Sequence, residues 1–286
     1  MKKMRTILTG LLLVAILGTA GCGGSSKTAT QQPAAQPAPE AKQEFRVGME
    51  CGYPPFNWTQ IEDNGIQIDG NAEFAGGYDV QIAKKIADGL GRDLVVVKTE
   101  WDGLVPALQS GVIDAIIAGM SPTAERKGSI DFTDAYYRSN LVMIVKKGGE
   151  YENATKLSDF SGAKIVAQLN TFHDTVIDQI PDVQHETAMP DFPTMRVALE
   201  SGIIDGYVGE RPEGVSATAA NPNFACVEFA EGEGFECTDD DVAVAVGIAK
   251  GNEDLVAQIN DILAGISEAE RLEIMDQAVK DQPAEQ

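Results

Sequence analysis

The chain has few of the residues that most metal and nucleotide chemistry requires. Among its 286 residues are four cysteines, two histidines and 6% aromatic side chains. His173 and His185 have no third ligand at a spacing typical of a metal site, so the sequence predicts neither a metal nor another cofactor. The phosphate-binding pattern GxxxxGK[ST] is also absent, so any nucleotide hydrolysis linked to this protein is expected in another chain.

Basic residues are also scarce, with 22 lysines and arginines against 44 acidic residues. The first 21 residues carry three of the basic residues and no acid, so the rest of the chain has a net charge of −25, from 19 basic and 44 acidic residues. A polyanion would be repelled by this charge, which excludes a nucleic-acid binder. The charge does not by itself indicate a cationic ligand, because total surface charge mainly affects solubility.

The most hydrophobic run lies near the N-terminus, where Ile7 to Leu17 follows the three basic residues. This run is too short to cross a membrane as a helix and predicts a secretion signal over residues 1–21. Gly21 and Cys22 resemble a bacterial lipobox, which implies that Cys22 carries a lipid, although Thr19 stands where lipoboxes usually have leucine. The alternative is a plain cleaved signal. Residues 22–43, rich in Gly, Ser, Gln, Ala and Pro, are then a flexible lipid-anchored linker.

The stretch from Trp101 to Tyr137 organises the rest of the chain. Asp102 can cap a helix that ends at Gly111, and Ile113–Ala118 is an apolar strand. A loop between a parallel strand and a helix N-terminus is suited to anions, and Arg126 there offers a bidentate grip for a carboxylate. The alternative is a solvated surface arginine. The loop residues expected beside it are Gly119, Met120 and Ser121.

Three motifs together resemble the family 3 extracellular solute-binding proteins, the amino-acid receptors of ABC importers. They are GLVPALQSG…IDAIIAGMSPTAERKGSIDFTDAYY (103–137), YPPF (53–56) and GGYDVQIAKKIADGLG (76–91). The resemblance covers residues 44–280. It implies a two-lobed α/β fold of the type II periplasmic-binding-protein class, with a mostly parallel sheet flanked by helices in each lobe and two crossing strands as a hinge.

The same resemblance places residues 44–139 and 242–286 in lobe 1 and residues 140–241 in lobe 2. An internal repeat supports two similar lobes independently of the family. The sequence ALQSGVID (107–114) recurs as ALESGIID (198–205), and both copies read as a helix end, a glycine cap and a buried strand.

The first lobe is expected to supply the walls of the ligand site. In related receptors, an aromatic at the position of Tyr53 stacks on the ligand side chain, and Trp101 matches a second wall. Phe56 lies beside the same turn, and ordinary core packing is the alternative for both Tyr53 and Phe56. Glu50, at the end of the first strand, matches an acid that reads the distal group of the ligand.

The second lobe is expected to hold the backbone groups of an amino acid. Thr171 and the N–H of Phe172 match groups that bind the α-carboxylate, whereas Asn170 replaces the usual glycine. His173 matches another polar contact, with a surface histidine as the alternative. Glu210 matches the acid that pairs with the α-ammonium, usually an aspartate; otherwise it is a loop acid that is solvated or paired with the next arginine.

Three cysteines remain if Cys22 is lipidated. Cys226 and Cys237 flank an acidic segment, and an exported protein permits a disulfide between them, but the sequence leaves this pairing open. Cys51 is expected to be a small buried residue.

The sequence therefore predicts a binding protein rather than an enzyme. Two lobes would close on one free amino acid, and the closed form would deliver it to an ABC permease and its ATPase subunit. Glu50 favours a basic ligand, lysine or arginine, with glutamine or another neutral polar amino acid as the alternative. The protein is expected to be an extracytoplasmic monomer that binds no nucleic acid and reaches the membrane only by its lipid. Two other functions stay open: an exported dehydratase on the same fold and a ligand-sensing partner of a signalling receptor.

Overall fold

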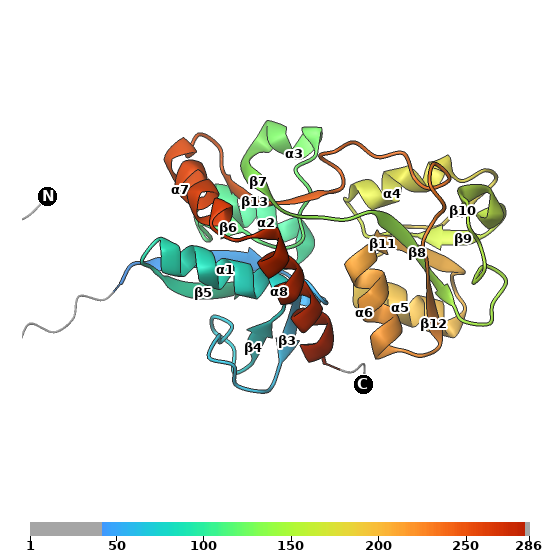
Figure 1. The fold of residues 1–286 in the computed structure, drawn as a ribbon, viewed down its shortest axis with the longest axis horizontal. Coiled ribbons are helices and arrows are strands. Elements are labelled where there is room, and N and C mark those ends of the chain that lie inside the picture. Colours follow the sequence, from blue (N-terminus) through green and yellow to red (C-terminus); the bar gives the residue numbers. More distant parts are fainter. Residues whose placement is uncertain (1–41, 284–286) are drawn as a thin grey trace, which may run out of the picture. The chain divides into compact units, whose positions relative to one another are not determined.

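Two five-stranded sheets organise residues 42–283, the part of the chain that the computed structural model describes (Figure 1). The predicted signal sequence, Cys22 and nearly all of the predicted linker lie outside the described residues. No helix within residues 42–283 has both the length and the hydrophobicity that crossing a membrane requires. The predicted mixed α/β class is confirmed, because helices flank both sheets (Figure 1).

The first sheet, which defines lobe 1, has the strand order β5-β1-β6-β13-β7. Strand β1 pairs in parallel with β5 and β6, and β13 pairs antiparallel with β6 and β7. Four of the five strands therefore run in one direction. The strands are β1 (Glu44–Met49), β5 (Asp93–Lys98), β6 (Ala115–Ile116), β7 (Ile130–Arg138) and β13 (Ala243–Ala249).

The second sheet, which defines lobe 2, has the same kind of arrangement, in the order β10-β9-β11-β8-β12. Strand β9 pairs in parallel with β10 and β11, and β8 pairs antiparallel with β11 and β12. Again one strand of five opposes the others. The strands are β8 (Leu141–Lys146), β9 (Lys164–Val166), β10 (Gln184–His185), β11 (Gly206–Glu210) and β12 (Phe224–Val227).

Amphipathic helices cover the sheets of both lobes. In α1 the residues Val80, Ala83, Ile86 and Ala87 recur at helical spacing, and all four are buried. The helices of lobe 1 are α1 (Tyr78–Gly89), α2 (Trp101–Gln109), α3 (Ala124–Ser129), α7 (Glu253–Ala264) and α8 (Glu268–Asp281). Those of lobe 2 are α4 (Phe172–Val176), α5 (Phe192–Ser201) and α6 (Arg211–Ala220), with 3-10 turns η1 (Leu157–Phe160) and η2 (Ile177–Gln179).

A small three-stranded sheet follows β1 in lobe 1 and consists of β2 (Gly52–Tyr53), β3 (Asn57–Gln60) and β4 (Phe74–Gly76). It carries Tyr53 to the boundary with lobe 2. There Tyr53 belongs to the same buried apolar cluster as Phe192 of α5, so the hydrophobic core continues from one lobe into the other. The boundary is therefore a packed surface in this structure.

Two chain segments pass between the sheets side by side. The first joins β7 to β8 through Ser139 and Asn140, and the second leads from lobe 2 into β13. The N–H of Ser139 donates to the carbonyl of Val242 at 3.0 Å, so the two segments hold each other where they cross.

The sequence repeat corresponds to a repeated set of hydrogen bonds. Asp114 donates its N–H to the carbonyl of Arg46 (2.8 Å), and its carboxylate accepts the N–H of Arg46 (2.9 Å). Asp205 makes the same two bonds with Lys164 (2.9 and 2.8 Å). Each aspartate thus ties the segment that follows a helix to the first parallel strand of its own lobe, so the repeat marks equivalent positions in the two lobes.

Two details of the sequence prediction around Trp101–Tyr137 are wrong. Helix α2 begins at Trp101 with Glu100 as its N-cap, and Asp102 lies in the first turn, where its carboxylate accepts from Asn170 instead. Strand β6 comprises only Ala115 and Ile116, because only these residues of the predicted Ile113–Ala118 strand occupy the sheet registers with β1 and β13.

Cys226 and Cys237 are free thiols rather than a disulfide. Cys226 lies on β12 and packs toward Gly214 of α6 in the first apolar cluster. Cys237 packs against the second cluster, in lobe 2, so the two thiols belong to different cores. Cys51 is also free and is buried, as predicted.

Candidate functional site

A small cavity, here called the inner cleft, lies between the lobes. Its volume is about 10 Å³, close to the minimum of about 10–15 Å³ that a cavity needs to hold one water molecule. Side chains therefore nearly fill it in this structure. Nine of the predicted site residues line it: Tyr53, Trp101, Gly119, Ser121, Arg126, Thr171, Phe172, His173 and Glu210.

Two lining residues, Gln168 and Phe192, were not found from the sequence. Gln168 lies just beyond β9, and Phe192 is the first residue of α5. The repeat held a signal for Gln168. Arg46 and Lys164 are equivalent strand residues, bound by Asp114 and Asp205 respectively. Glu50 lies four residues after Arg46, and Gln168 lies four residues after Lys164.

Arg126 brings a half-buried positive charge to the inner cleft from α3. Its guanidinium donates to the carbonyls of Ser121 (3.0 Å) and Asn170 (3.2 Å) and lies 5.0 Å from the ring centre of Trp101. Burial lowers the pKa of Arg126 to about 10, so the group stays charged at neutral pH. Both of these acceptors are neutral carbonyls, and a carboxylate would be a stronger partner in their place.

Glu210 faces the inner cleft from the end of β11 and is buried. One carboxyl oxygen accepts the Tyr53 hydroxyl, and the other lies 3.1 Å from His173 Nε2 without hydrogen-bond geometry. Burial raises the pKa of Glu210 to about 8 and lowers the pKa of His173 to about 3, the latter also because Arg126 is near. At neutral pH the pair is therefore an uncharged carboxyl and imidazole. A cation beside Glu210 would favour its ionised form.

Aromatic rings from both lobes line the inner cleft together with Arg126 and Glu210. Tyr53 of lobe 1 stacks on Phe192 of lobe 2, with ring centres 4.2 Å apart and planes inclined by 12°. Phe56, predicted as part of the wall, is fully buried behind Tyr53 at 4.9 Å and does not line the inner cleft. Phe56 is therefore a core residue, the alternative considered in the sequence analysis, and it packs behind the Tyr53 ring that faces the cleft.

The loop after β6 approaches the aromatic wall closely. Gly119 has a φ of 63°, and a Cβ at this position would lie 2.7 Å from the Tyr53 ring, so glycine is required. Met120 is buried away from the cleft, and its carbonyl accepts from Ala245 at 3.0 Å. The hydroxyl of Ser121 donates to the carbonyl of Asp241 at 2.8 Å, which ties the loop to the returning crossing segment.

The loop before α4 reaches across to lobe 1. Asn170 has a φ of 57°, a conformation that asparagine tolerates better than most residues. Its side-chain amide donates to the Asp102 carboxylate at 2.8 Å, and its carbonyl accepts from Trp101 at 3.4 Å. The next residue, Thr171, is the N-cap of α4, and its hydroxyl donates to the carbonyl of Gln168 at 2.6 Å.

Glu50 does not line the inner cleft but borders it through Gln168. The Gln168 amide donates to Glu50 Oε1 at 2.9 Å and to the carbonyl of Pro190 at 3.0 Å. Burial raises the pKa of Glu50 to about 8 despite the hydrogen bond from Gln168, with a further contribution from nearby Asp191. Glu50 instead lines a separate cavity of 430 Å³, here called the outer chamber.

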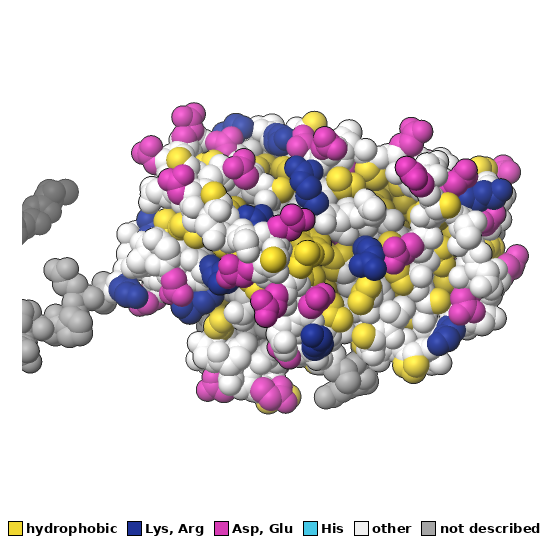
Figure 2. Space-filling view, in the orientation of Figure 1, with side chains coloured by type: hydrophobic (Ala, Val, Ile, Leu, Met, Phe, Trp, Pro, Cys, Tyr) yellow, Lys and Arg dark blue, Asp and Glu magenta, His cyan; other side chains and the backbone are white. Residues whose placement is uncertain are grey.

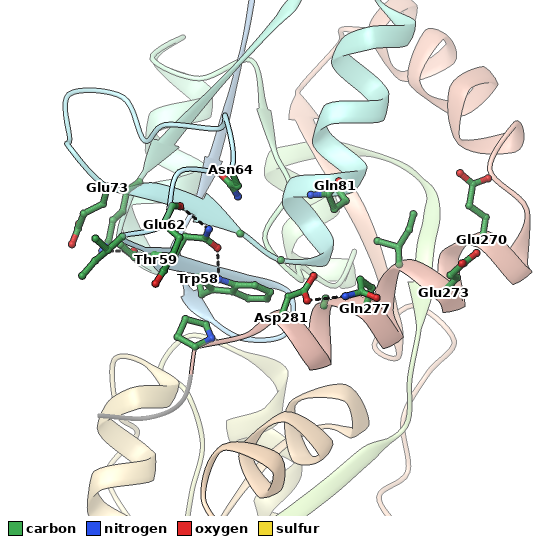
Figure 3. Close-up of a pocket in the computed structure, with 18 residues that line it drawn as sticks. Trp58, Thr59, Glu62, Asn64, Glu73, Gln81, Glu270, Glu273, Gln277 and Asp281 are labelled. Atoms are coloured by element: carbon green, nitrogen blue, oxygen red, sulfur yellow. Dashed lines mark hydrogen bonds between the residues drawn. The ribbon is translucent and has the colours of Figure 1, made fainter.

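A cavity of 1330 Å³ forms a groove on lobe 1 between β3 and α8 (Figure 3). Glu62, Glu73, Glu270 and Glu273 project around it, and none of the predicted site residues lines it. Nor do His, Cys, Asp and Glu side chains gather in threes as a metal site anywhere in residues 42–283. On the face drawn in Figure 2, acidic and basic side chains are interspersed without a continuous basic patch.

Comparison with protein-family models gives a match over residues 45–278. The matching family is described as bacterial extracellular solute-binding proteins, family 3. The match spans both sheets and all the residues of the inner cleft.

Two relatives and one solved structure illustrate the similarity. The chain is 33% identical to a probable histidine-binding protein of Campylobacter jejuni, over 82% of this chain and 85% of the relative. It is 30% identical to the L-cystine-binding protein TcyJ of Escherichia coli K12, over 76% of this chain and 75% of the relative. An amino acid ABC transporter substrate-binding protein from Streptococcus pneumoniae, bound to L-arginine, matches with a TM-score of 0.73 and 26% identity, covering 83% of this chain and 94% of that one. The predicted two-lobed binding-protein fold is thereby confirmed.

Proposed function

We propose, on the premise that this chain belongs to the bacterial extracellular solute-binding proteins of family 3, that it captures one free basic amino acid between its lobes and delivers it to an ABC permease. One observation carries the proposal. Half-buried Arg126 from lobe 1 and buried Glu210 from lobe 2 line the same cavity. These groups complement the carboxylate and the ammonium that every free amino acid carries on its α-carbon.

Arg126 would bind the α-carboxylate as a bidentate partner in place of the carbonyls that it now contacts. Thr171 and the N–H groups at the start of α4 would complete the carboxylate site from lobe 2, and Ser121 would do so from lobe 1. Glu210 would lose its proton and bind the α-ammonium. A bound ammonium supplies the positive charge that keeps a buried carboxylate ionised.

The side chain of the ligand would run between aromatic faces toward Glu50. Tyr53, Phe192 and Trp101 would contact its methylene groups, and their ring faces favour a cation. Glu50 would pair with a basic end group, which would favour the ionised form of a carboxyl whose pKa is raised by burial and by nearby acidic residues. The similarity to proteins named as histidine-binding and arginine-bound supports a basic ligand, and the cystine-binding relative makes cystine a necessary comparison.

Lobe closure would couple capture to transport. We propose that residues 44–139 and 242–286 move as one body and residues 140–241 as the other, about the crossing segments held by Ser139 and Val242. Closure excludes water, so the charged hydrogen bonds to the ligand strengthen in the low-dielectric cleft. The closed form would then dock on the permease, and a separate ATPase subunit would drive transport.

The proposed location is the outer side of the cell membrane, reached by a lipid on Cys22. This anchor follows from the lipobox resemblance and the linker over residues 22–43. We also propose that the protein acts as a monomer, because a single chain supplies both halves of the inner cleft.

Calorimetric titration tests this function. The protein without residues 1–22, unfolded and refolded to remove bound ligand, would be titrated separately with lysine, arginine, histidine, glutamine, glutamate and cystine. Micromolar or tighter binding of arginine or lysine, abolished by Arg126→Ala, is the expected result. Tight binding of glutamine alone would preserve the class and refute the basic ligand, whereas no heat from any amino acid would refute amino-acid capture.

We further propose that the protein has no catalytic activity of its own. The two ionisable groups Arg126 and Glu210 of the inner cleft are accounted for by binding a zwitterion, and the two relatives described above are named as binding proteins. Incubation with prephenate or arogenate, followed by chromatography, should give no product. Turnover that Glu210→Gln abolishes would instead establish a dehydratase.

A further inference from the structure

Asp79 is a fully buried acid in the first turn of α1. It lines neither the inner cleft nor the outer chamber, so the proposed capture of a ligand leaves its role open. Burial raises its pKa to about 6, although hydrogen bonds from Tyr136, Asn57 and the Gly119 backbone favour the ionised form. Asp79 is therefore mainly a carboxylate at neutral pH. A buried charge is costly unless donors satisfy it, so the groups that donate to it indicate its role.

One oxygen of Asp79 is connected to the turn that follows β1. Asn57 donates its side-chain amide to Asp79 Oδ2 at 2.8 Å, and its amide oxygen accepts the N–H of Cys51 at 2.8 Å. Cys51 has a φ of 54°, a conformation that few residues other than glycine adopt, so this bond holds the chain where it turns sharply. Tyr53, whose ring lines the inner cleft, follows in the same turn.

The other oxygen of Asp79 is connected to the loop that follows β6. Tyr136 on β7 donates its hydroxyl to Asp79 Oδ1 at 2.7 Å. The N–H of Gly119 donates to this hydroxyl oxygen at 3.3 Å and also interacts with the Asp79 carboxylate. Gly119 lies against the Tyr53 ring, and the same loop leads into α3 with Arg126. One carboxylate thus connects the two segments through which lobe 1 reaches the inner cleft.

The charge of Asp79 sets the direction of these hydrogen bonds. A carboxylate only accepts, so both side chains that face it must donate. Asn57 is thereby oriented with its oxygen toward Cys51, and Tyr136 has an oxygen lone pair left for Gly119. An amide in place of the carboxylate would leave one buried donor without an acceptor in either of its two orientations.

We propose that Asp79 is a positioning residue for ligand binding, which holds the turn at Cys51 and the loop at Gly119 in a fixed relation from behind the inner cleft. This inference rests on the proposed function, because it assumes that Tyr53 and Arg126 contact the ligand. The network lies wholly within lobe 1 and includes no ligand group. It therefore orders both segments in advance, which lowers the entropic cost of binding.

Exchange of the carboxylate and the amide between positions 57 and 79 tests the network. Asp79→Asn alone should weaken the binding of L-arginine, measured by calorimetry, roughly ten-fold, as for loss of one buried hydrogen bond. Combining it with Asn57→Asp restores every donor and acceptor. The carboxylate at 57 accepts from Cys51 and from the amide at 79, whose oxygen still accepts from Tyr136. The double variant should bind within roughly three-fold of wild type; binding no tighter than that of Asp79→Asn would overturn the proposal.

Two neighbouring tyrosines provide a matched control. Tyr78 and Tyr136 are both fully buried, with ring centres 6.0 Å apart, but the Tyr78 hydroxyl donates to the backbone carbonyl of Tyr136 at 2.9 Å. Tyr136→Phe should weaken arginine binding roughly three-fold or more, because Asp79 loses a donor and Gly119 an acceptor. Tyr78→Phe also removes a buried hydroxyl but should leave the affinity unchanged. Equal weakening by both changes would indicate a general effect on the core and overturn the proposal.

Amide hydrogen exchange, followed by NMR, measures the positioning without a ligand. Relative to the amides of α1, Asp79→Asn should speed exchange at both Cys51 and Gly119, and Tyr136→Phe should speed it at Gly119 alone. Unchanged exchange at both amides in Asp79→Asn would overturn the positioning role while leaving amino-acid capture intact. Absence of amino-acid binding by the wild-type protein would refute the proposed function, and the exchange rates would still decide whether Asp79 holds the two segments.

Discussion

Glu50 and Gln168 occupy equivalent positions in the two lobes and hydrogen-bond to each other at 2.9 Å. Glu50 lies four residues after Arg46 in lobe 1, and Gln168 lies four residues after Lys164 in lobe 2. Arg46 and Lys164 are the strand residues that the two equivalent aspartates bind. The internal symmetry of the chain therefore places a carboxyl opposite an amide at the boundary of the inner cleft. A basic ligand that takes the carboxyl must release the amide.

Ligand capture should release protons because burial raises the pKa of the Glu210 carboxyl above neutral pH. Burial raises its pKa to about 8, so at pH 7 the closed protein without an ammonium partner holds this proton, whereas the complex with an α-ammonium requires the carboxylate. Affinity should therefore rise with pH below 8 and level off above it. Calorimetry at pH 7 in buffers of different ionisation enthalpy should detect this release.

The number of protons should depend on the ligand. A neutral amino acid such as citrulline should release close to one proton, and arginine should release more, because Glu50, whose pKa is also about 8, then ionises as well. Glu210→Gln should remove the release seen with citrulline and weaken binding by roughly 30-fold or more, the usual effect of losing one member of a buried charge pair. Glu228→Gln, an exposed acid of lobe 2, is the matched control. Equal proton release in Glu210→Gln and wild type would contradict this assignment.

Asn170 should stabilise the closed lobes through Asp102. Asn170→Gly removes the 2.8 Å bond between these side chains, and glycine accepts the φ of 57°. The loss of one partly exposed hydrogen bond from the closed state should lower ligand affinity by roughly two- to five-fold. Small-angle X-ray scattering of ligand-free protein should show a larger radius of gyration.

The coupling between these two residues can be measured directly. Asp102→Ala should have the same effect on affinity as Asn170→Gly, and the double variant should be no weaker than either one. Additive effects of the two changes would show that the bond across the lobes does not contribute to closure.

The two equivalent aspartates should contribute unequally to folding stability. Asp114→Ala leaves the N–H of Arg46 without its acceptor in a partly buried position, which should lower the free energy of unfolding by about 1–2 kcal/mol. Asp205→Ala removes the corresponding bond to Lys164 where it is exposed, so water can replace it and the loss should be smaller. Urea unfolding of both variants measures the difference. A larger loss for Asp205→Ala would contradict the burial argument.

Three thiols should be alkylated after unfolding of the protein without residues 1–22. Cys51, Cys226 and Cys237 are free, in spite of the exported context that the family implies. Mass spectrometry after denaturation and iodoacetamide treatment without reductant should show three additions. In the native protein Cys51, which is buried, should react most slowly. A single addition would indicate one disulfide, and comparison with Cys237→Ser would identify its members.

The sequence by itself determined the class of fold and the chemistry at the ends of the strands. Apolar runs, helix periodicity and the motif around Arg126 depend only on local order, and they indicated the α/β class and the strand ends. Together with the family resemblance, they led to nine of the residues that line the inner cleft. The repeat at Asp114 and Asp205 was also visible, because equivalent lobes keep equivalent hydrogen-bonding residues at the same place in the chain.

Only the tertiary structure decided which side chains meet across the lobes and how they ionise. Phe56 lies behind Tyr53 while Phe192 takes the facing position, since stacking depends on how α5 docks against β2. The pKa values of Glu50 and Glu210 are raised because both lobes together exclude water from these carboxyl groups, and no pattern within one strand contains that information. The hydrogen bond from Gln168 to Glu50 joins residues 118 positions apart in the chain. The local sequence around either residue therefore does not indicate that the other is its partner.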